Sequence, residues 1–298
     1  MATGRFFTDM KSRFSRGDIV TQLLYINIGI YILVTVVNIV LILFRLPTTP
    51  YTGYLELPSS FTRFLYQPWS IITYMFMHAG LLHLIFNMLW LYWFGKLFLM
   101  FFSGKHLRGI YILGGICGGL LYMIAYNLFP YFEDMVDYST LVGASASVLA
   151  IVFAVGMAQP NYEVQFMFIG RIKLKYVALC VFLLDLLFIT SGNSGGHIAH
   201  IGGALSGIWF ASSLRKGRDI TSWINKIIDA LTGGVKIKRR KPKMKVHYNS
   251  DKQKDYEYNA KKKQQSDEID RILDKLRKSG YGSLTDDEKK SLFNASKK

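Results

Sequence analysis

Long apolar segments alternate with short polar connections over the first two thirds of the chain. Six segments are candidate membrane-spanning helices, near residues 21–44, 83–102, 107–129, 145–159, 176–190 and 197–214. A hydrocarbon core roughly 30 Å thick needs about 20 apolar residues per helix. The first segment is too long for a signal-peptide core of about 7–15 residues, so we expect a retained anchor. The pattern predicts an all-α polytopic membrane protein with six transmembrane helices in one bundle.

The distribution of charge supports this organisation and extends it. The chain has 298 residues, is 51% hydrophobic and 15% aromatic, and nevertheless carries a formal net charge of +16. It is too apolar for a soluble domain, and its charge is concentrated after residue 214. We expect a cytoplasmic N-terminal segment over residues 1–19 and the membrane domain over 20–214. An amphipathic helix with a basic segment follows over 215–245, and a charged cytoplasmic tail over 246–298.

Basic residues mark every alternate connection between the candidate spans. They are Arg5, Lys11, Arg13 and Arg16, then Lys105 and Arg108, then Arg171, Lys173 and Lys175, and finally Arg215, Lys216 and Arg218. Short cytoplasmic loops are enriched in Lys and Arg. Both termini are therefore expected in the cytoplasm, and the regular alternation supports the count of six spans.

After the last span, the sequence predicts an amphipathic helix, then a basic run, and then a possible pair of short helices. One face of the expected helix is apolar, through Ile220, Trp223, Ile224, Ile227, Ile228 and Leu231, and Gly233 and Gly234 end it. The basic run at residues 236–245 favours anionic lipid headgroups, and no nucleic-acid partner is expected. Further on, a stripe of Ile269, Ile272, Leu273 and Leu276 and a capping box of Thr285 with Glu288 predict a helical hairpin or, equally, a marginally folded tail.

Polar residues gather at the same end of three spans. The second, fourth and sixth spans run in the same direction, so their first turns share the outer leaflet. These turns contain His83 and Asn87, Ser145 and Ser147, and His197 and His200. Any one of them could be an ordinary interhelical hydrogen-bond partner. Together they supply a hydroxyl, a base and hydrogen-bond donors, which are the functional groups that acyl transfer needs.

Each residue fits a particular role in such chemistry. Ser145 stands at a helix start, where free backbone N–H groups favour negative charge. His83 and Asn87 are four residues apart on one helix face, and both can donate to an oxyanion. His200 could accept the serine proton as a general base. Stripes of small residues would allow close approach of the helices, at Ala199, Gly203 and Gly207, at Ala146, Ala150 and Ala154, and, as packing only, at Gly114, Gly118, Gly115 and Gly119.

Three positions leave alternatives open. Ser147 lies roughly 200° around the helix from Ser145, so only one of them can face His200, and the angle alone does not decide which. His197 is interpreted as a solvated or loop-contacting histidine rather than the base. Asp185 is the one acid deep in an apolar run; it could orient a histidine as a third catalytic member, but a structural hydrogen bond or a cavity contact is favoured.

The sequence resembles the rhomboid family of intramembrane serine proteases in three strings that occur in order on alternate spans. These are PWSIITYMFMHAGLLHLIFNMLWLYWFG, GASAS and AHIGGALSG. The resemblance implies a six-helix core with Ser145 as nucleophile, His200 as general base, and His83 with Asn87 in the oxyanion hole. His78, Gly143 and Gly203 would support the site. The chain departs from the family pattern at Ser70, Ala146 and Leu149.

The resemblance also implies a function. The family cleaves transmembrane or membrane-proximal segments of other membrane proteins by a Ser-His dyad, without a metal ion or cofactor. We therefore expect an endopeptidase that spans a bacterial inner membrane several times. Two other classes remain: a catalytically silent relative that binds membrane clients, and a transporter or channel lined by the same polar groups, for which we see no inverted repeat.

Overall fold

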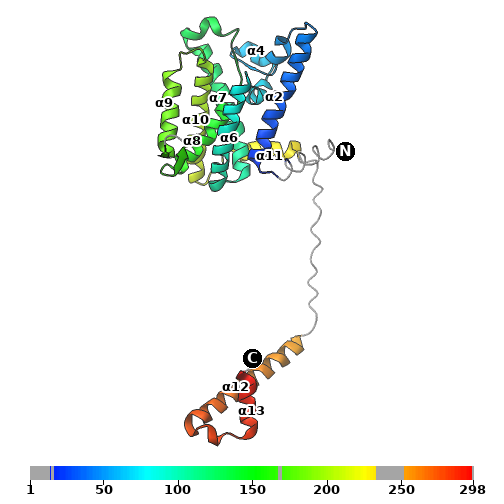
Figure 1. Ribbon diagram of the computed structural model, residues 1–298, viewed down its shortest axis with the longest axis vertical. Helices are drawn as coiled ribbons and strands as arrows, with labels where there is room; N and C mark the ends of the chain where they lie inside the picture. Colours follow the sequence, from blue (N-terminus) through cyan, green and yellow to red (C-terminus); the bar gives the residue numbers. More distant parts are fainter. Residues whose placement is uncertain (1–13, 15–16, 167–169, 233–251, 297–298) are drawn as a thin grey trace. The chain divides into compact units, whose positions relative to one another are not determined.

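The computed structural model describes residue 14 and residues 17–166, 170–232 and 252–296 (Figure 1). The chain divides into two compact units, Met1–Val235 and Lys236–Lys298. The first contains a helical bundle, and the second contains a separate pair of helices.

The main helices of the first unit coincide with the six predicted spans. They are α2 (Ile19–Leu43), α6 (Leu81–Phe101), α7 (Gly104–Leu128), α8 (Ser145–Ala158), α9 (Leu174–Leu187) and α10 (Ser194–Arg215). Among the described residues, α2, α6 and α7 are long and apolar enough to cross a membrane, whereas α8 is apolar but only 14 residues long. These helices indicate an integral membrane protein, and the count of six spans stays a prediction.

Helix α8 is buried along most of its length, and α6, α7 and α10 pack against it. A β-carbon built at Gly114 would lie 2.3 Å from the Ala150 β-carbon, and one at Gly118 would lie 2.6 Å from that of Ala146. The small residues of α7 and α8 therefore let these helices pack closely, as the sequence predicted. The methyl group of Ala146 fits because Gly118 faces it.

The connection between α2 and α6 is a structured loop. It contains α3 (Thr49–Gly53), β1 (Leu57–Pro58), α4 (Phe61–Tyr66), α5 (Ser70–Thr73) and η1 (Tyr74–Phe76). Trp69 Nε1 donates a hydrogen bond to the Tyr54 carbonyl at 2.8 Å, and Thr73 Oγ1 donates to the Leu55 carbonyl at 2.7 Å. The loop is thus held by side chain to backbone bonds, and Ser70 at the start of α5 is buried.

Two short antiparallel ladders complete the first unit. Strand β1 pairs with β2 (Thr140–Leu141), which follows η2 (Pro130–Met135) and leads to the start of α8. The pairing connects the α2–α6 loop to the segment that carries the α8 N-terminus. A hairpin of β3 (Glu163–Phe166) and β4 (Gly170–Lys173) joins α8 to α9.

The predicted amphipathic helix forms as α11 (Ser222–Thr232) and packs against α7. Ile224 is buried, while Trp223, Ile227 and Leu231 remain exposed. Arg108 of α7 donates hydrogen bonds to Asn225 Oδ1 at 2.9 Å and to Asp229 Oδ1 at 2.7 Å. Only one edge of the apolar face therefore faces the bundle. Gly233, Gly234 and the basic run at 236–245 lie outside the described residues.

The second unit contains the predicted helical hairpin. Helix α12 (Lys252–Ser279) and helix α13 (Asp286–Ser296) are joined through η3 (Tyr281–Ser283). Ile272 and Leu284 are buried. The Thr285 amide donates to the Glu288 carboxylate at 2.9 Å, and the Glu288 amide donates to Thr285 Oγ1 at 3.4 Å. The capping box is confirmed, and α12 is much longer than its apolar stripe required.

Candidate active site

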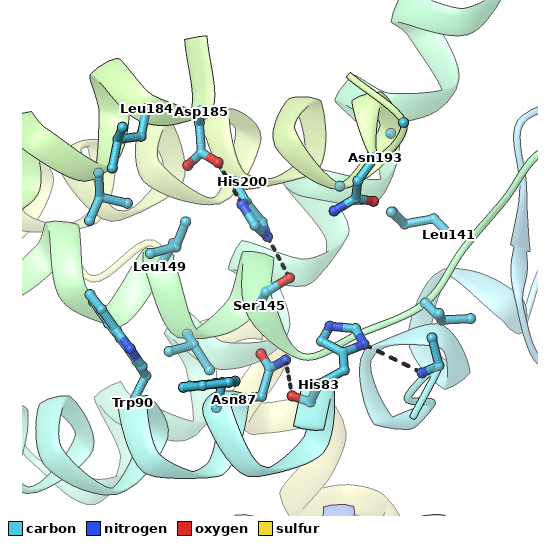
Figure 2. A pocket seen from close by; sticks show the side chains of 18 of the residues that line it. His83, Asn87, Trp90, Leu141, Ser145, Leu149, Leu184, Asp185, Asn193 and His200 are labelled. Atoms are coloured by element: carbon cyan, nitrogen blue, oxygen red, sulfur yellow. Dashed lines mark hydrogen bonds and ion pairs between the residues drawn. The ribbon is translucent and has the colours of Figure 1, made fainter. Parts of the chain in front are cut away.

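Ser145 and His200 meet between α8 and α10. Ser145 is the first residue of α8 and His200 lies in the second turn of α10, and Ser145 Oγ is 2.7 Å from His200 Nε2 (Figure 2). The two residues are 55 positions apart in the chain. Their contact depends on the close packing of the two helices, because Gly203 lies against the backbone of Ala146.

Ser147 faces a different environment. Its side chain is completely buried, and its hydroxyl has no hydrogen-bond partner within the described part of the chain. Of the two serines, Ser145 is the one that contacts His200.

Asp185 of α9 lies behind His200. One oxygen of its carboxylate, Oδ1, is 2.8 Å from His200 Nδ1 (Figure 2). The same oxygen is 2.8 Å from His197 Nδ1. Asp185 is only 6% exposed, so the two imidazoles replace the water that would solvate this oxygen. A carboxylate that accepts the Nδ1 proton leaves His200 Nε2 as the acceptor toward Ser145.

These contacts change two interpretations drawn from the sequence. The partner of Asp185 is the same histidine that contacts Ser145, which is the arrangement that the sequence analysis had not favoured. His197 does contact the connection after α9, because its ring centroid lies 6.0 Å from that of Phe188, but it also bonds to Asp185, which was not expected. The turn between α9 and α10 brings both histidines to the carboxylate, and a linear sequence does not specify that turn.

His83 and Asn87 line the opposite side of the site from His200 (Figure 2). Asn87 Nδ2 donates to the His83 carbonyl at 2.9 Å, and the Ala79 amide donates to His83 Nδ1 at 3.4 Å. With Nδ1 as an acceptor, the neutral His83 ring has its proton on Nε2 and can donate it. A β-carbon at Gly143 would lie 3.0 Å from this Nε2 atom and 3.6 Å from Ser145 Oγ.

Gly143 lies in the turn between β2 and α8. Its φ angle is +129°, a region that residues with a β-carbon rarely adopt, and its amide donates to the Tyr74 carbonyl at 3.0 Å. The turn directs the chain past His83 and into the first residue of α8.

His78 supports His83 rather than the Ser145 hydroxyl. The ring centroids of the two histidines are 5.4 Å apart in an edge-on arrangement. Both ring nitrogens of His78 are buried and have no hydrogen-bond partner among the described residues. Its contact with His83 gives it a packing role beside the site.

A cavity of about 670 Å³ opens beside the Ser145 hydroxyl. Its polar lining includes His83, Asn87, Ser145, Asn193 and His200, and its apolar lining includes Trp90, Val148, Leu149, Val181 and Leu184. Neither Asn193 nor Trp90 is among the site residues expected from the sequence. The position of Asn193, a polar residue directly before α10, could have indicated its place in the site. Trp90 lies in an aromatic run, and the sequence does not indicate which of these side chains face the cavity.

One group of residues also has the donor atoms of a metal site. The possible ligand atoms of Asp185, His197 and His200 lie within 4.8 Å of one another. Asp185 is buried and the two histidines are partly exposed.

The helices and the site define a class: a helical membrane protein with a serine and a histidine in hydrogen-bond contact beside a cavity. Residues 66–217, about half of the chain, match the family model of the Rhomboid domain, and the chain belongs to the rhomboid family. The family resemblance drawn from the sequence is thus confirmed. Residues 248–298 match a second model, described as a family of unknown function (DUF6576).

Three curated relatives match with moderate identity. RHOMBOID-like protein 12, mitochondrial, of Arabidopsis thaliana is 29% identical over 160 residues, which are 50% of this chain and 47% of the relative. Rhomboid-like protease 3 of Toxoplasma gondii is 26% identical over 53% of this chain and 56% of the relative. Rhomboid-related protein 1 of Caenorhabditis elegans is 32% identical over 48% of this chain and 39% of the relative. The chain spans about half the length of these relatives.

Proposed function

We propose that this protein is an intramembrane serine endopeptidase in which Ser145 is the nucleophile and His200 the general base. The observation that supports this most directly is the distance of 2.7 Å between Ser145 Oγ and His200 Nε2. A nucleophile and a base within hydrogen-bond reach, with the base oriented by a third group, are the signature of an activated serine.

In the proposed reaction, Ser145 Oγ attacks a peptide carbonyl carbon while His200 Nε2 accepts the hydroxyl proton. The carbonyl oxygen becomes an oxyanion between the Ser145 amide, His83 Nε2 and Asn87 Nδ2, which would donate hydrogen bonds to it. His200 then gives its proton to the leaving amine, and the carbon–nitrogen bond breaks. Water attacks the acyl-enzyme with His200 again as the base, and the second product leaves with a new carboxylate.

Asp185 has a positioning role in this scheme. Its carboxylate holds the Nδ1 proton of His200, so the neutral ring presents a lone pair to Ser145. It also stabilises the imidazolium that forms during attack. The proposal therefore adds a carboxylate to the dyad that the family resemblance implies.

The proposed substrates are transmembrane or membrane-proximal segments of other proteins. A peptide must be extended for its carbonyl to reach Ser145, so the substrate helix would unwind locally. The apolar side of the cavity, with Trp90, Leu149 and Leu184, would accept an apolar side chain of such a segment. Hydrolysis also needs water, and the polar residues of the cavity provide partners for it.

We further propose six spans with both termini on the cytoplasmic side, in a bacterial inner membrane. The exposed residues Trp223, Ile227 and Leu231 of α11 would enter the headgroup region, and the basic run at 236–245 would attract anionic lipids.

Labelling with a fluorophosphonate probe tests the proposed chemistry. Wild type, Ser145→Ala, Ser147→Ala and His200→Ala are purified in detergent, and each is also incubated with a model transmembrane substrate in liposomes. We expect labelling and cleavage in wild type and Ser147→Ala, and neither in the other two variants. A wild type that is folded but neither labelled nor active would contradict the proposal and favour a protein that binds membrane clients without cutting them.

A further inference from the structure

We propose that Asp185, His197 and His200 bind a divalent transition-metal ion of the Zn²⁺ type, and that this ion switches the serine off. The binding rests on these three side chains alone, and the inhibition rests on the proposed function.

The three side chains provide a suitable donor set. Two imidazole nitrogens and a carboxylate oxygen are ligands that Zn²⁺ prefers, and three protein ligands with one open position are common at accessible zinc sites. The possible ligand atoms lie within 4.8 Å of one another. Around a tetrahedral ion with bonds of about 2.1 Å, ligand atoms are roughly 3.4 Å apart. Small side-chain rotations would therefore suffice, since Asp185 Oδ1 is already 2.8 Å from each Nδ1 atom.

His197 is the residue that the catalytic scheme leaves unexplained. The contact between Asp185 and His200 is enough to orient the base toward Ser145. The His197 imidazole nevertheless contacts the same Asp185 oxygen, Oδ1. His197 and His200 are three residues apart on α10, so they share one helix face. Their side chains are each 20% exposed, and His200 lines the cavity, which gives an ion a route to the ligands.

Metal binding would change which nitrogen of His200 carries the proton. With Asp185 as the acceptor, His200 carries its proton on Nδ1 and accepts at Nε2. An ion takes the Nδ1 lone pair, so the neutral ring must carry its proton on Nε2, and no net proton is released. Nε2–H would then donate to Ser145 Oγ across the same 2.7 Å contact. Because the hydroxyl then has no base, the serine would lose its nucleophilic character.

Zn²⁺ binding is measured first, with an inactive variant, so that the result does not depend on protease activity. Full-length protein with Ser145→Ala is stripped with EDTA, dialysed against Zn²⁺ and analysed for bound metal, and Co²⁺ is added separately to record its visible absorption. The same measurements are made after adding His197→Gln. The matched control is His106→Gln, a histidine near Asp219 and outside this group.

We expect one Zn²⁺ per chain that depends on His197, with His106→Gln binding as the parent does. Loss of the ligand should weaken binding by at least the roughly 10- to 100-fold that loss of an outer-shell partner causes. Equal Zn²⁺ affinity in the parent and the His197→Gln protein would overturn the site.

Inhibition is measured as the fluorophosphonate labelling rate of each Ser145-containing protein with and without Zn²⁺. Wild type and His106→Gln should lose labelling as Zn²⁺ rises and regain it with EDTA, whereas the rate of His197→Gln should change little. Zn²⁺ binding with unchanged labelling would overturn the switch. A third outcome is that the protein binds Zn²⁺ but does not react with the probe even when Zn²⁺ is absent. That result would refute the proposed protease activity but not the metal site.

Discussion

Gly203 of α10 and Ala146 of α8 are in direct backbone contact. A β-carbon at Gly203 would lie 2.1 Å from the carbonyl oxygen of Ala146, closer than any real carbon approaches a backbone oxygen. Ala146 follows Ser145 and Gly203 lies three residues after His200. The contact therefore fixes the separation of the helices beside the Ser145–His200 hydrogen bond.

Gly203→Ala should force α8 and α10 apart, because the clash is with backbone that cannot rotate away. Overpacking of this kind costs about 1–3 kcal/mol, so we expect a lower melting temperature in detergent and reduced probe labelling. The control is Gly29→Ala in α2, where a β-carbon meets nothing within 4 Å. If both variants melted and reacted like wild type, the close contact would not be required.

Asp185→Asn should slow acylation without removing the serine or the base. The amide can present its N–H₂ group to His200 Nδ1, which favours the tautomer with the proton on Nε2. We expect kcat to fall by at least about tenfold with little change in KM, since the carboxylate acts on the transition state. Cleavage kinetics with a fluorescent transmembrane peptide would measure both constants. A change confined to KM would show that Asp185 shapes the cavity instead.

Gly143→Ala should damage both the turn and the proposed oxyanion site. The φ angle of +129° becomes strained with a β-carbon, at a cost of about 1–3 kcal/mol, and the new methyl group would press on the His83 ring. We expect a lower melting temperature and a loss of labelling. An active Gly143→Ala protein with an unchanged melting temperature would refute the role given to this turn.

The second unit should lose stability in acid through Glu288. Its hydrogen bond with Lys275, helped by the Thr285 amide, lowers the pKa of Glu288 from 4.5 to about 2. The folded-state pKa is depressed, so the stabilisation is complete above pH 4.5 and is lost as the pH falls toward 2. Hydrogen exchange of α13 amides in the full chain, corrected for intrinsic rates, should show this loss.

Variants separate this effect from general acid unfolding. Lys275→Met should remove most of the extra loss of protection between pH 4.5 and 2, whereas Asp286→Asn, at a side chain that is 97% exposed, should retain it. An identical pH profile in wild type and Lys275→Met would contradict the assignment.

The sequence by itself determined the helices and which of their residues could do chemistry. Hydropathy is a local property, so the apolar runs located α2, α6 to α10 and α11, and the Thr285–Glu288 spacing located the start of α13. The direction of the spans brought His83, Ser145 and His200 to one end of the bundle without any coordinates.

Only the tertiary structure decided how these groups are paired. The contact of Asp185 with both His197 and His200 depends on the angle at which α9 meets α10, and the burial of Ser147 depends on the rotation of α8. Such angles arise from side-chain packing between helices, where shifts of an ångström make or break a hydrogen bond. The hydrophobic pattern carries no information at that scale, and it therefore could not show that one carboxylate serves two histidines.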